Sequence, residues 1–168
     1  MRRAMTDLVV RRFDADDRVV MERLYLMFRH DLSEFQGQLP QADGSYRSDW
    51  LESALTGDPE WAGYIFHSGE HPVGYCLMRA LQQPVRVLNS FFIVRPMRRG
   101  GHGLRAVQEV LSHHPGPCEV AFQDNNSTAV SFWKRVGAAM SGDDWTLEHR
   151  PIKGRPDAPP DTWISFTV

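Results

Sequence analysis

Residues 91–103 read FFIVRPMRRGGHG, which joins an apolar strand, a basic loop and a glycine-rich approach to a helix. The segment 91–94 is apolar on both faces, which predicts a central strand covered by helices on each side. Glycines at positions 100, 101 and 103 allow positive φ and a close approach of the backbone to a ligand. With a helix N-terminus and the charges of Arg98 and Arg99, this pattern predicts a phosphate cradle. A glycine-rich turn with two solvated arginines is the alternative.

Two nucleotide-binding motifs can be compared with this stretch. The P-loop is excluded because no Gly-Lys-Ser/Thr follows the glycines. Gly101-x-Gly103-x-x-Ala106 fits the dinucleotide fingerprint G-x-G-x-x-A. That motif expects an acidic residue at the end of the next strand, whereas Glu119 begins it, and too little chain follows for a doubly wound sheet. A nicotinamide-dinucleotide-binding domain therefore stays a remote alternative.

A second motif lies downstream, where residues 126–137 read NSTAVSFWKRVG. This segment resembles the motif N-x-x-A-x-x-F-Y-x-x-x-G of the GNAT superfamily of acyl-CoA-dependent N-acyltransferases. Arg98-x-x-Gly101-x-Gly103 is similar to the acyl-CoA pyrophosphate signature (R/Q)-x-x-G-x-(G/A) of the same superfamily. The resemblance extends over about residues 8–140, and the aromatic pairs beside both motifs are similar to a bacterial branch of predicted acetyltransferases.

The resemblance implies that acetyl-CoA is the co-substrate. Two widely spaced cysteines and the lack of a His-x-x-x-His pattern give no reason to expect a metal. The strand before the glycines would pair its backbone with the pantetheine amides, and one of its N–H groups would stabilise charge on the thioester oxygen. The N–H groups of residues 99–104 would hold the pyrophosphate, and Asn126 would reach the pantetheine arm as well as cap its helix. The implied acyl-CoA-binding residues are Phe92, Ile93, Val94, Arg98, Arg99, Gly100, Gly101, His102, Gly103, Leu104, Asn126 and Trp133.

The implied reaction is direct attack of a neutral amine on the thioester. Glu34, Ser90 and Glu119 are the acceptor-side candidates, and a solvated carboxylate is the alternative for each glutamate. Ser90 stands where many relatives carry a glutamate, and Trp133 stands where the superfamily usually has the tyrosine that protonates the leaving thiolate. Both departures favour a second hypothesis, a non-catalytic acyl-CoA-binding module. The sequence leaves the catalytic acid and base unassigned.

The acceptor is expected to be a small-molecule or peptide amine. It would bind between the segment 31–55 and the C-terminal strands. Exposed strand edges would allow a homodimer.

Hydrophobic periodicity predicts the remaining elements. Strands are predicted at 8–13, 61–67, 73–81, 85–94, 118–122 and 163–168. Helices are predicted at 18–35, 48–55, 103–114 and 126–136, and a proline-rich loop at 154–160. This order predicts an α/β sandwich, one domain over 1–168, with a central mixed, mostly antiparallel sheet flanked by helices.

Composition limits the function further. The chain has 168 residues, 42% hydrophobic, with 19 basic and 21 acidic side chains, a balance that does not indicate a nucleic-acid partner. No apolar run approaches the length of a membrane span, so we expect no membrane partner and a cytoplasmic protein. Cys76 and Cys118 lie in apolar runs and are expected to be buried hydrophobes, not metal ligands. The pair His113-His114 is expected to be a solvated helix end.

Overall fold

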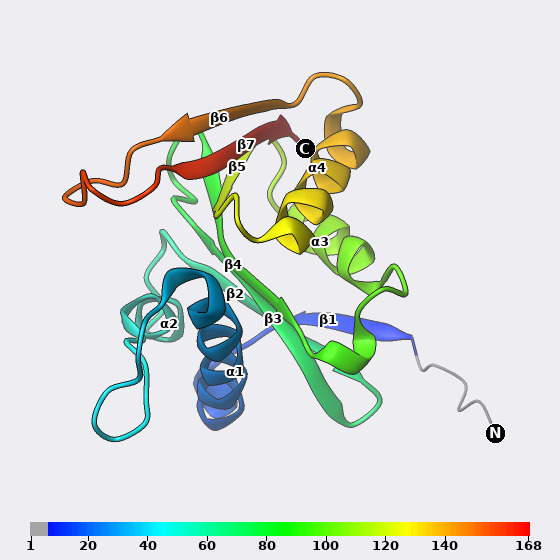
Figure 1. Cartoon of the computed structure of the whole chain (residues 1–168). Helices are drawn as coiled ribbons and strands as arrows, with labels where there is room; N and C mark the ends of the chain where they lie inside the picture. The colour runs from blue at the N-terminus through cyan, green and yellow to red at the C-terminus, as the bar shows by residue number, and fades with distance from the viewer. Residues whose placement is uncertain (1–6) are drawn as a thin grey trace.

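The computed structural model describes residues 7–168, in which seven strands form one mixed sheet with the order β1-β2-β3-β4-β5-β7-β6 (Figure 1). The strands are β1 (Leu8–Arg12), β2 (Ala62–Ser68), β3 (His71–Arg79), β4 (Arg86–Ile93), β5 (Pro117–Phe122), β6 (Thr146–Arg150) and β7 (Asp161–Thr167). The helices are α1 (Arg18–Gln36), α2 (Asp49–Leu55), α3 (His102–Ser112) and α4 (Ser127–Ser141), with short 3-10 turns η1 (Ala15–Asp17) and η2 (Arg95–Met97). The predicted mixed, mostly antiparallel sheet is confirmed.

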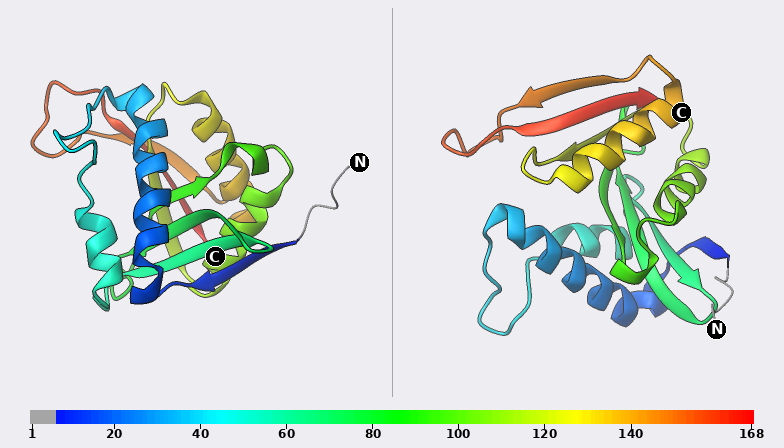
Figure 2. Two further views of the ribbon diagram at one scale, coloured as in Figure 1. Left: turned by 90° about the horizontal axis from the view of Figure 1, so that it is seen from below. Right: turned by 45° about the vertical axis from the view of Figure 1, so that its right-hand side comes forward.

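Helices cover both faces of the sheet, α1 and α2 on one side and α3 and α4 on the other (Figure 2). Side chains alternate along a strand, so neighbouring residues of β4 enter different cores. Phe92 packs with Tyr75 beneath α1, while Ile93 packs with Val107 beneath α3. The prediction that this strand is covered on both faces is therefore confirmed.

The sheet splits between β4 and β5, the parallel pair. Their register spans three positions, from Arg86 opposite Cys118 to Leu88 opposite Val120. Beyond Leu88, β4 continues to Ile93 on its pairing with β3 alone. The register with β3 shifts at the same place: Met78 faces Leu88 and Leu77 faces Ser90, so that Asn89 is an extra, bulged residue. Such a bulge bends one strand away from its neighbour and opens a gap in the middle of the sheet.

Two elements differ from the sequence-based expectation. Strand β6 was not predicted, because its sequence TLEHR is mostly exposed and polar and lacks the alternation of a half-buried strand. Helix α4 continues five residues beyond Val136, through Gly137. That glycine does not end the helix because its bare Cα lets Trp145 pack closely; a Cβ there would lie 3.0 Å from Cγ of that indole.

Both cysteines are buried and free, as expected, and burial raises the pKa of Cys118 to about 12. None of the helices that the structure describes has the length and apolarity needed to cross a bilayer.

Candidate cofactor and acceptor site

The loop between β4 and α3, residues 98–104 and here called the cradle loop, presents a row of backbone donors. Arg99 and Gly101 have φ of 66° and 79°, while Gly100 between them does not have positive φ. Alternation of this kind turns successive N–H groups towards one point, an arrangement that binds anions. Within the described part of the chain, no N–H of residues 99–104 donates to a backbone acceptor; the first bond of α3 runs from Arg105 N to Gly101 O, at 3.2 Å.

A non-glycine residue in the left-handed region is uncommon and strained, so Arg99 is an unexpected feature of the loop. Of the three glycines that could adopt positive φ, only Gly101 does so, and Gly100 and Gly103 do not. Gly103 has a different function. A Cβ there would lie 3.2 Å from the ring of Phe132, so this glycine permits close packing of α3 on α4. A Cβ on Gly101 would meet nothing within 4 Å, and the space in front of it is free for a ligand.

The two arginines of the loop have different surroundings. Arg98 donates through Nε to the carbonyl of Ile93 at 2.7 Å and through Nη2 to Oδ2 of Asp31 at 2.6 Å. Arg95 donates to the other carboxylate oxygen at 2.9 Å. Arg99 is exposed and forms no ion pair with any residue that the structure describes. Arg99 is therefore the cation left available to a phosphate, while Arg98 fastens the loop to α1.

Asp31 is the common partner of the two tethered arginines. Burial raises its pKa, but the hydrogen bonds from Arg98 and Arg95 outweigh this, so the pKa of Asp31 lies below its ordinary value. The carboxylate therefore stays charged at neutral pH and holds the start of the loop.

Backbone groups of β4 face the gap beside the cradle loop. The N–H of Val94 donates to Val73 O at 2.8 Å, towards β3. Because these groups alternate along a strand, those of Phe92 also point to β3, and those of Phe91 and Ile93 point to the gap. The carbonyl of Ile93 is occupied by Arg98. This leaves the N–H and C=O of Phe91 and the N–H of Ile93 as the groups that could pair with an extended ligand.

Aromatic side chains connect the end of β4 with α4. The ring of Phe91 stacks on that of Phe132, with centroids 5.4 Å apart, and meets Trp133 edge-on at 5.8 Å. Trp133 is 6% exposed and belongs to the core beneath α3 and α4. Asn126 caps α4, its Oδ1 accepting from the N–H of Ala129 at 3.1 Å, and its amide nitrogen is left for another partner. The cap that the sequence suggested is confirmed.

The imidazole of His102 stands at the start of α3. It is buried, and Arg105 donates to its Nδ1 at 3.0 Å, since a guanidinium has no acceptor. Its Nε2 is buried without a partner in the described residues. The backbone N–H groups of His102 and Leu104 have no backbone acceptor among the described residues, while the imidazole of His102 is buried and the side chain of Leu104 packs against the core.

Unsatisfied polar atoms mark the bulged stretch of β4. Ser90 Oγ, Asn89 Nδ2 and the hydroxyl of Tyr75 are buried without a hydrogen-bond partner among the described residues. Burial raises the pKa of Tyr75 well above its ordinary value, and the Ser90 hydroxyl is a nearby group. Buried polar atoms are normally paired, so their clustering here indicates a place for water or for a polar ligand group.

Glu119 lies on the same side of the sheet as Ser90. Its neighbours Cys118 and Val120 point into the core beneath α3 and α4, so its own side chain points to the opposite face. Arg150 donates to its carboxylate at 2.9 Å, and the Glu119 side chain is 17% exposed. In the strand register Glu119 faces Val87, one position before the split.

Glu34 is separated from this pair. It lines a hollow of about 390 Å³ at the end of α1, together with Asp31 and Arg95. Of the three acceptor-side candidates, the structure therefore places Ser90 and Glu119 on one face beside the split, and Glu34 near the cradle loop. No cluster of three or more His, Cys, Asp or Glu side chains suited to a metal ion occurs in the described residues.

The comparisons with known proteins agree with this geometry. The model of the GNAT acetyltransferase family matches residues 23–138, and the chain therefore belongs to that family. It is an acetyl-CoA-dependent N-acetyltransferase. No curated protein sequence matches the chain.

Several solved structures share the fold at low identity. An acetyltransferase from Thermus thermophilus is 14% identical, with a TM-score of 0.68 over 98% of this chain and 99% of that one. Spermidine N-acetyltransferase from Vibrio cholerae, in complex with CoA and spermine, is 13% identical, with a TM-score of 0.68 over 96% and 95%. The ribosomal-protein-S18-alanine N-acetyltransferase from Escherichia coli is 8% identical, with a TM-score of 0.65 over 96% and 94%. The shared fold is not a doubly wound parallel sheet, so the dinucleotide-binding alternative is wrong.

Proposed function

We propose that the chain transfers an acetyl group from acetyl-CoA to a primary amine by direct attack on the thioester. One observation supports the proposal most directly. The part of β4 that is not paired with β5 leads directly into the cradle loop, whose N–H groups have no backbone acceptor. The diphosphate would sit on the N–H groups of residues 99–104 beside Arg99, and the pantetheine would lie along Phe91 and Ile93. The thioester would then reach the split just beyond Leu88 and Val120.

The amine nitrogen attacks the thioester carbon, a C–N bond forms and the C–S bond breaks. A backbone N–H at the β4 edge donates to the oxygen that carries the developing negative charge. CoA leaves as the thiolate, which a thiol of pKa about 8.5 tolerates. The indole of Trp133 is a hydrogen-bond donor and not a usable acid, so the thiolate takes its proton from water.

Glu119 is the carboxylate placed to receive the proton that the amine nitrogen loses. It lies one position before the split, on the face opposite α3 and α4. Arg150 donates to the carboxylate at 2.9 Å and holds it in place. The carboxylate accepts the proton directly or through one water near Ser90. An anionic group here also suits a cationic acceptor, and the enzymes of similar fold include one acting on spermidine and one on a ribosomal protein.

The alternative that the sequence left open, a non-catalytic acyl-CoA-binding module, does not agree with the family match. The sequence features behind it are Trp133, which takes the place of a proton donor, and Ser90, which is a poor base. The two candidates differ in one respect: the enzyme releases free CoA when an amine is present, and the binding module does not.

The test of the proposed function has two stages. Thermal shift with acetyl-CoA, CoA, NAD and ATP measures which ligand stabilises the fold, since stabilisation equals RT ln(1 + [L]/Kd). Release of free CoA thiol is then followed against a panel of polyamines, aminoglycosides, amino acids and peptides. We expect stabilisation by acetyl-CoA and CoA only, and amine-dependent thiol release that Glu119→Gln lowers strongly while CoA affinity stays within a few-fold. Stabilisation by NAD alone would contradict the proposal.

A further inference from the structure

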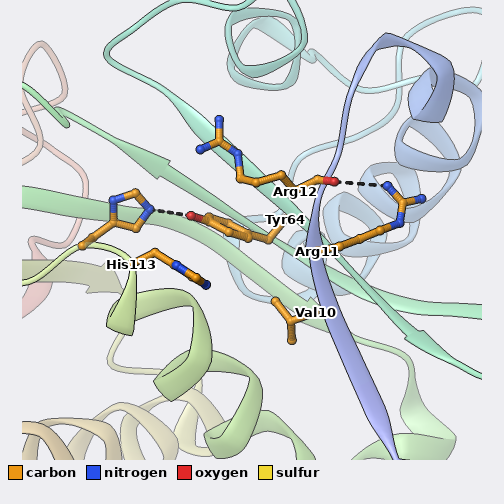
Figure 3. A pocket seen from close by; sticks show the side chains of 6 residues that line it. Val10, Arg11, Arg12, Tyr64 and His113 are labelled. Atoms are coloured by element: carbon orange, nitrogen blue, oxygen red, sulfur yellow. Dashed lines mark hydrogen bonds between the residues drawn. The ribbon is translucent and has the colours of Figure 1, made fainter.

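A second hollow, of about 390 Å³, lies under the C-terminal end of α3, beside β1 (Figure 3). Its lining comes from β1, β2 and the two histidines that follow α3: Val10, Arg11, Arg12, Tyr64, His113 and His114. Helix α3 has 11 residues, so at about 1.5 Å per residue the hollow is about 16 Å along the helix from the cradle loop. The two sites are therefore distinct.

The hollow is built around the ring of Tyr64. The Tyr64 hydroxyl and Nε2 of His114 share a hydrogen bond of 2.8 Å. The imidazole of His113 stacks on the ring with centroids 5.9 Å apart, and the guanidinium of Arg12 lies 5.4 Å from the ring centroid. The expectation of a solvated His113-His114 helix end is thus wrong for His114, which is half-buried and hydrogen-bonded.

The charges around the hollow are not balanced. Arg11 is neutralised by a two-fold hydrogen bond to Asp17, at 2.7 and 2.9 Å. Within the described part of the chain, neither Arg12 nor Arg86, which lies near His114, forms an ion pair with a carboxylate. Burial lowers the pKa of His114 to about 4, and the charges of Arg12, Arg86 and His113 act in the same direction.

We propose that this hollow binds a small phosphate dianion, either inorganic phosphate or the phosphoryl group of a monoester. The guanidinium of Arg12 offers a planar pair of donors that matches phosphate oxygens, and the imidazoles of His113 and His114 complete the donor set. The C-terminal end of α3 carries partial negative charge, but its repulsion of a bound anion is weakened here. The N–H groups of His113 and His114 already donate to the carbonyls of Val110 and Leu111, at 3.1 and 2.8 Å.

Binding of a dianion is coupled to a proton. The groups that face the His114 imidazole are Arg12 on β1, Tyr64 on β2, Arg86 on β4 and His113 beside it, and none of them is anionic at neutral pH. A bound dianion would place negative charge beside the His114 imidazole and so favour its protonated form, the imidazolium. For a ligand that keeps both charges, binding therefore takes up protons and strengthens as the pH is lowered towards about 4, the pKa of His114 without the ligand. Sulfate is the probe for this dependence, because it stays a dianion while phosphate does not.

The experiment is a phosphate titration of protein saturated with CoA, so that the cradle loop is already filled. The imidazole NMR signals of His113 and His114 report on the hollow directly, at constant ionic strength. We expect a saturable shift of both signals in the wild type and in Arg23→Gln, a variant at an exposed residue outside the lining of the hollow, with the same loss of charge. Binding is expected to be about tenfold weaker in Arg12→Gln and intermediate in Arg12→Lys, which keeps the charge but loses the fork.

Glycerol phosphate distinguishes the two sources of the ligand. Tighter binding of the ester identifies an organic phosphate, and equal binding identifies inorganic phosphate. Shifts of His113 and His114 that do not saturate, or that are the same in Arg12→Gln as in the wild type, would overturn the proposal. So would sulfate affinity that does not rise as the pH is lowered.

Discussion

The carboxylate of Asp31 on α1 accepts hydrogen bonds from Arg98 at 2.6 Å and from Arg95 at 2.9 Å, and so ties the cradle loop to the first helix. The loop is also held by the hydrogen bond from Arg98 to the Ile93 carbonyl and by the packing of Gly103 on Phe132. A single carboxylate thus links the segment that would bind the diphosphate to the helix expected to border the acceptor. We infer that Asp31 is a positioning residue and not a ligand.

Asp31→Asn is expected to weaken CoA binding several-fold, because the loop loses its charged tether and its ordered N–H row. The measurement is the Kd for CoA by calorimetry. Asp49→Asn is the matched control, since it removes a carboxylate whose ion pair with Arg47 is fully at the surface. A Kd that is the same in Asp31→Asn as in the control would mean that the loop is ordered without α1.

Gly101→Val is expected to abolish CoA binding. The substitution places a β-branched side chain in the open space before the cradle and strains a residue with φ of 79°, at a cost of about 1–2 kcal/mol in stability. Gly154→Val is the control, because Gly154 also has positive φ, of 77°, with nothing within 4 Å of its Cβ position. Both variants should lose similar thermal stability, and only Gly101→Val should lose its response to CoA. A normal response in Gly101→Val would place the diphosphate elsewhere.

Arg98→Ala and Arg99→Ala are expected to weaken the binding of different ligands. Arg99→Ala removes the free cation and should weaken CoA binding by about 1–2 kcal/mol, with little effect on a pantetheine analogue that lacks the diphosphate. Arg98→Ala removes the tether to Ile93 and Asp31, which loosens the end of β4, and should weaken both ligands. The measurement is the Kd of each ligand for each variant. Equal losses on both ligands for Arg99→Ala would make Arg99 a structural residue as well.

Trp133→Tyr tests whether a proton donor is needed at the leaving thiolate. With the wild type we expect activity to rise with pH as the amine deprotonates, with no falling limb near pH of about 10, where tyrosines titrate. Trp133→Tyr should keep CoA affinity within a few-fold and leave kcat equal or higher. Trp133→Ala should cost about 3–5 kcal/mol in stability, since the indole is almost fully buried. A falling limb in the wild type that another substitution removes would identify a different acid.

The stability of the fold should fall in acid partly through His114. Its folded pKa of about 4 lies below the unfolded value of about 6.5, so the unfolded state binds the proton more readily as the pH falls through that range. Unfolding by denaturant at pH values between these limits measures the effect. His114→Gln should show a smaller loss of unfolding free energy over the range than the wild type does. Parallel curves for the two proteins would contradict the burial of a neutral imidazole here.

Hydrophobic periodicity and the two motifs were sufficient to predict the mixed sheet and the cap at Asn126. They were not sufficient for the details that depend on tertiary contacts. The left-handed Arg99 was missed because only a few per cent of non-glycine residues adopt that conformation. Tyr75 reads as an ordinary core aromatic on a strand, and only the bulge of β4 places its hydroxyl near Ser90.

The sequence also could not assign the different tasks of the two arginines. Arg98 and Arg99 are adjacent and chemically identical, and the partner that separates them, Asp31, lies 67 residues before Arg98. The surroundings of His114 likewise depend on a distant partner, Tyr64, which lies 50 residues earlier in the sequence. A long-range contact of this kind leaves no periodic signal in the chain.

The most direct test of the account is the yield of free CoA thiol against acetylated amine in one reaction, with acetyl-CoA saturating and the amine varied. We expect amine-dependent thiol release, one thiol for each acetylated amine, which Gly101→Val abolishes and Gly154→Val retains. A wild-type protein that binds acetyl-CoA but releases no thiol with any amine of the panel would contradict it, and would favour the binding module.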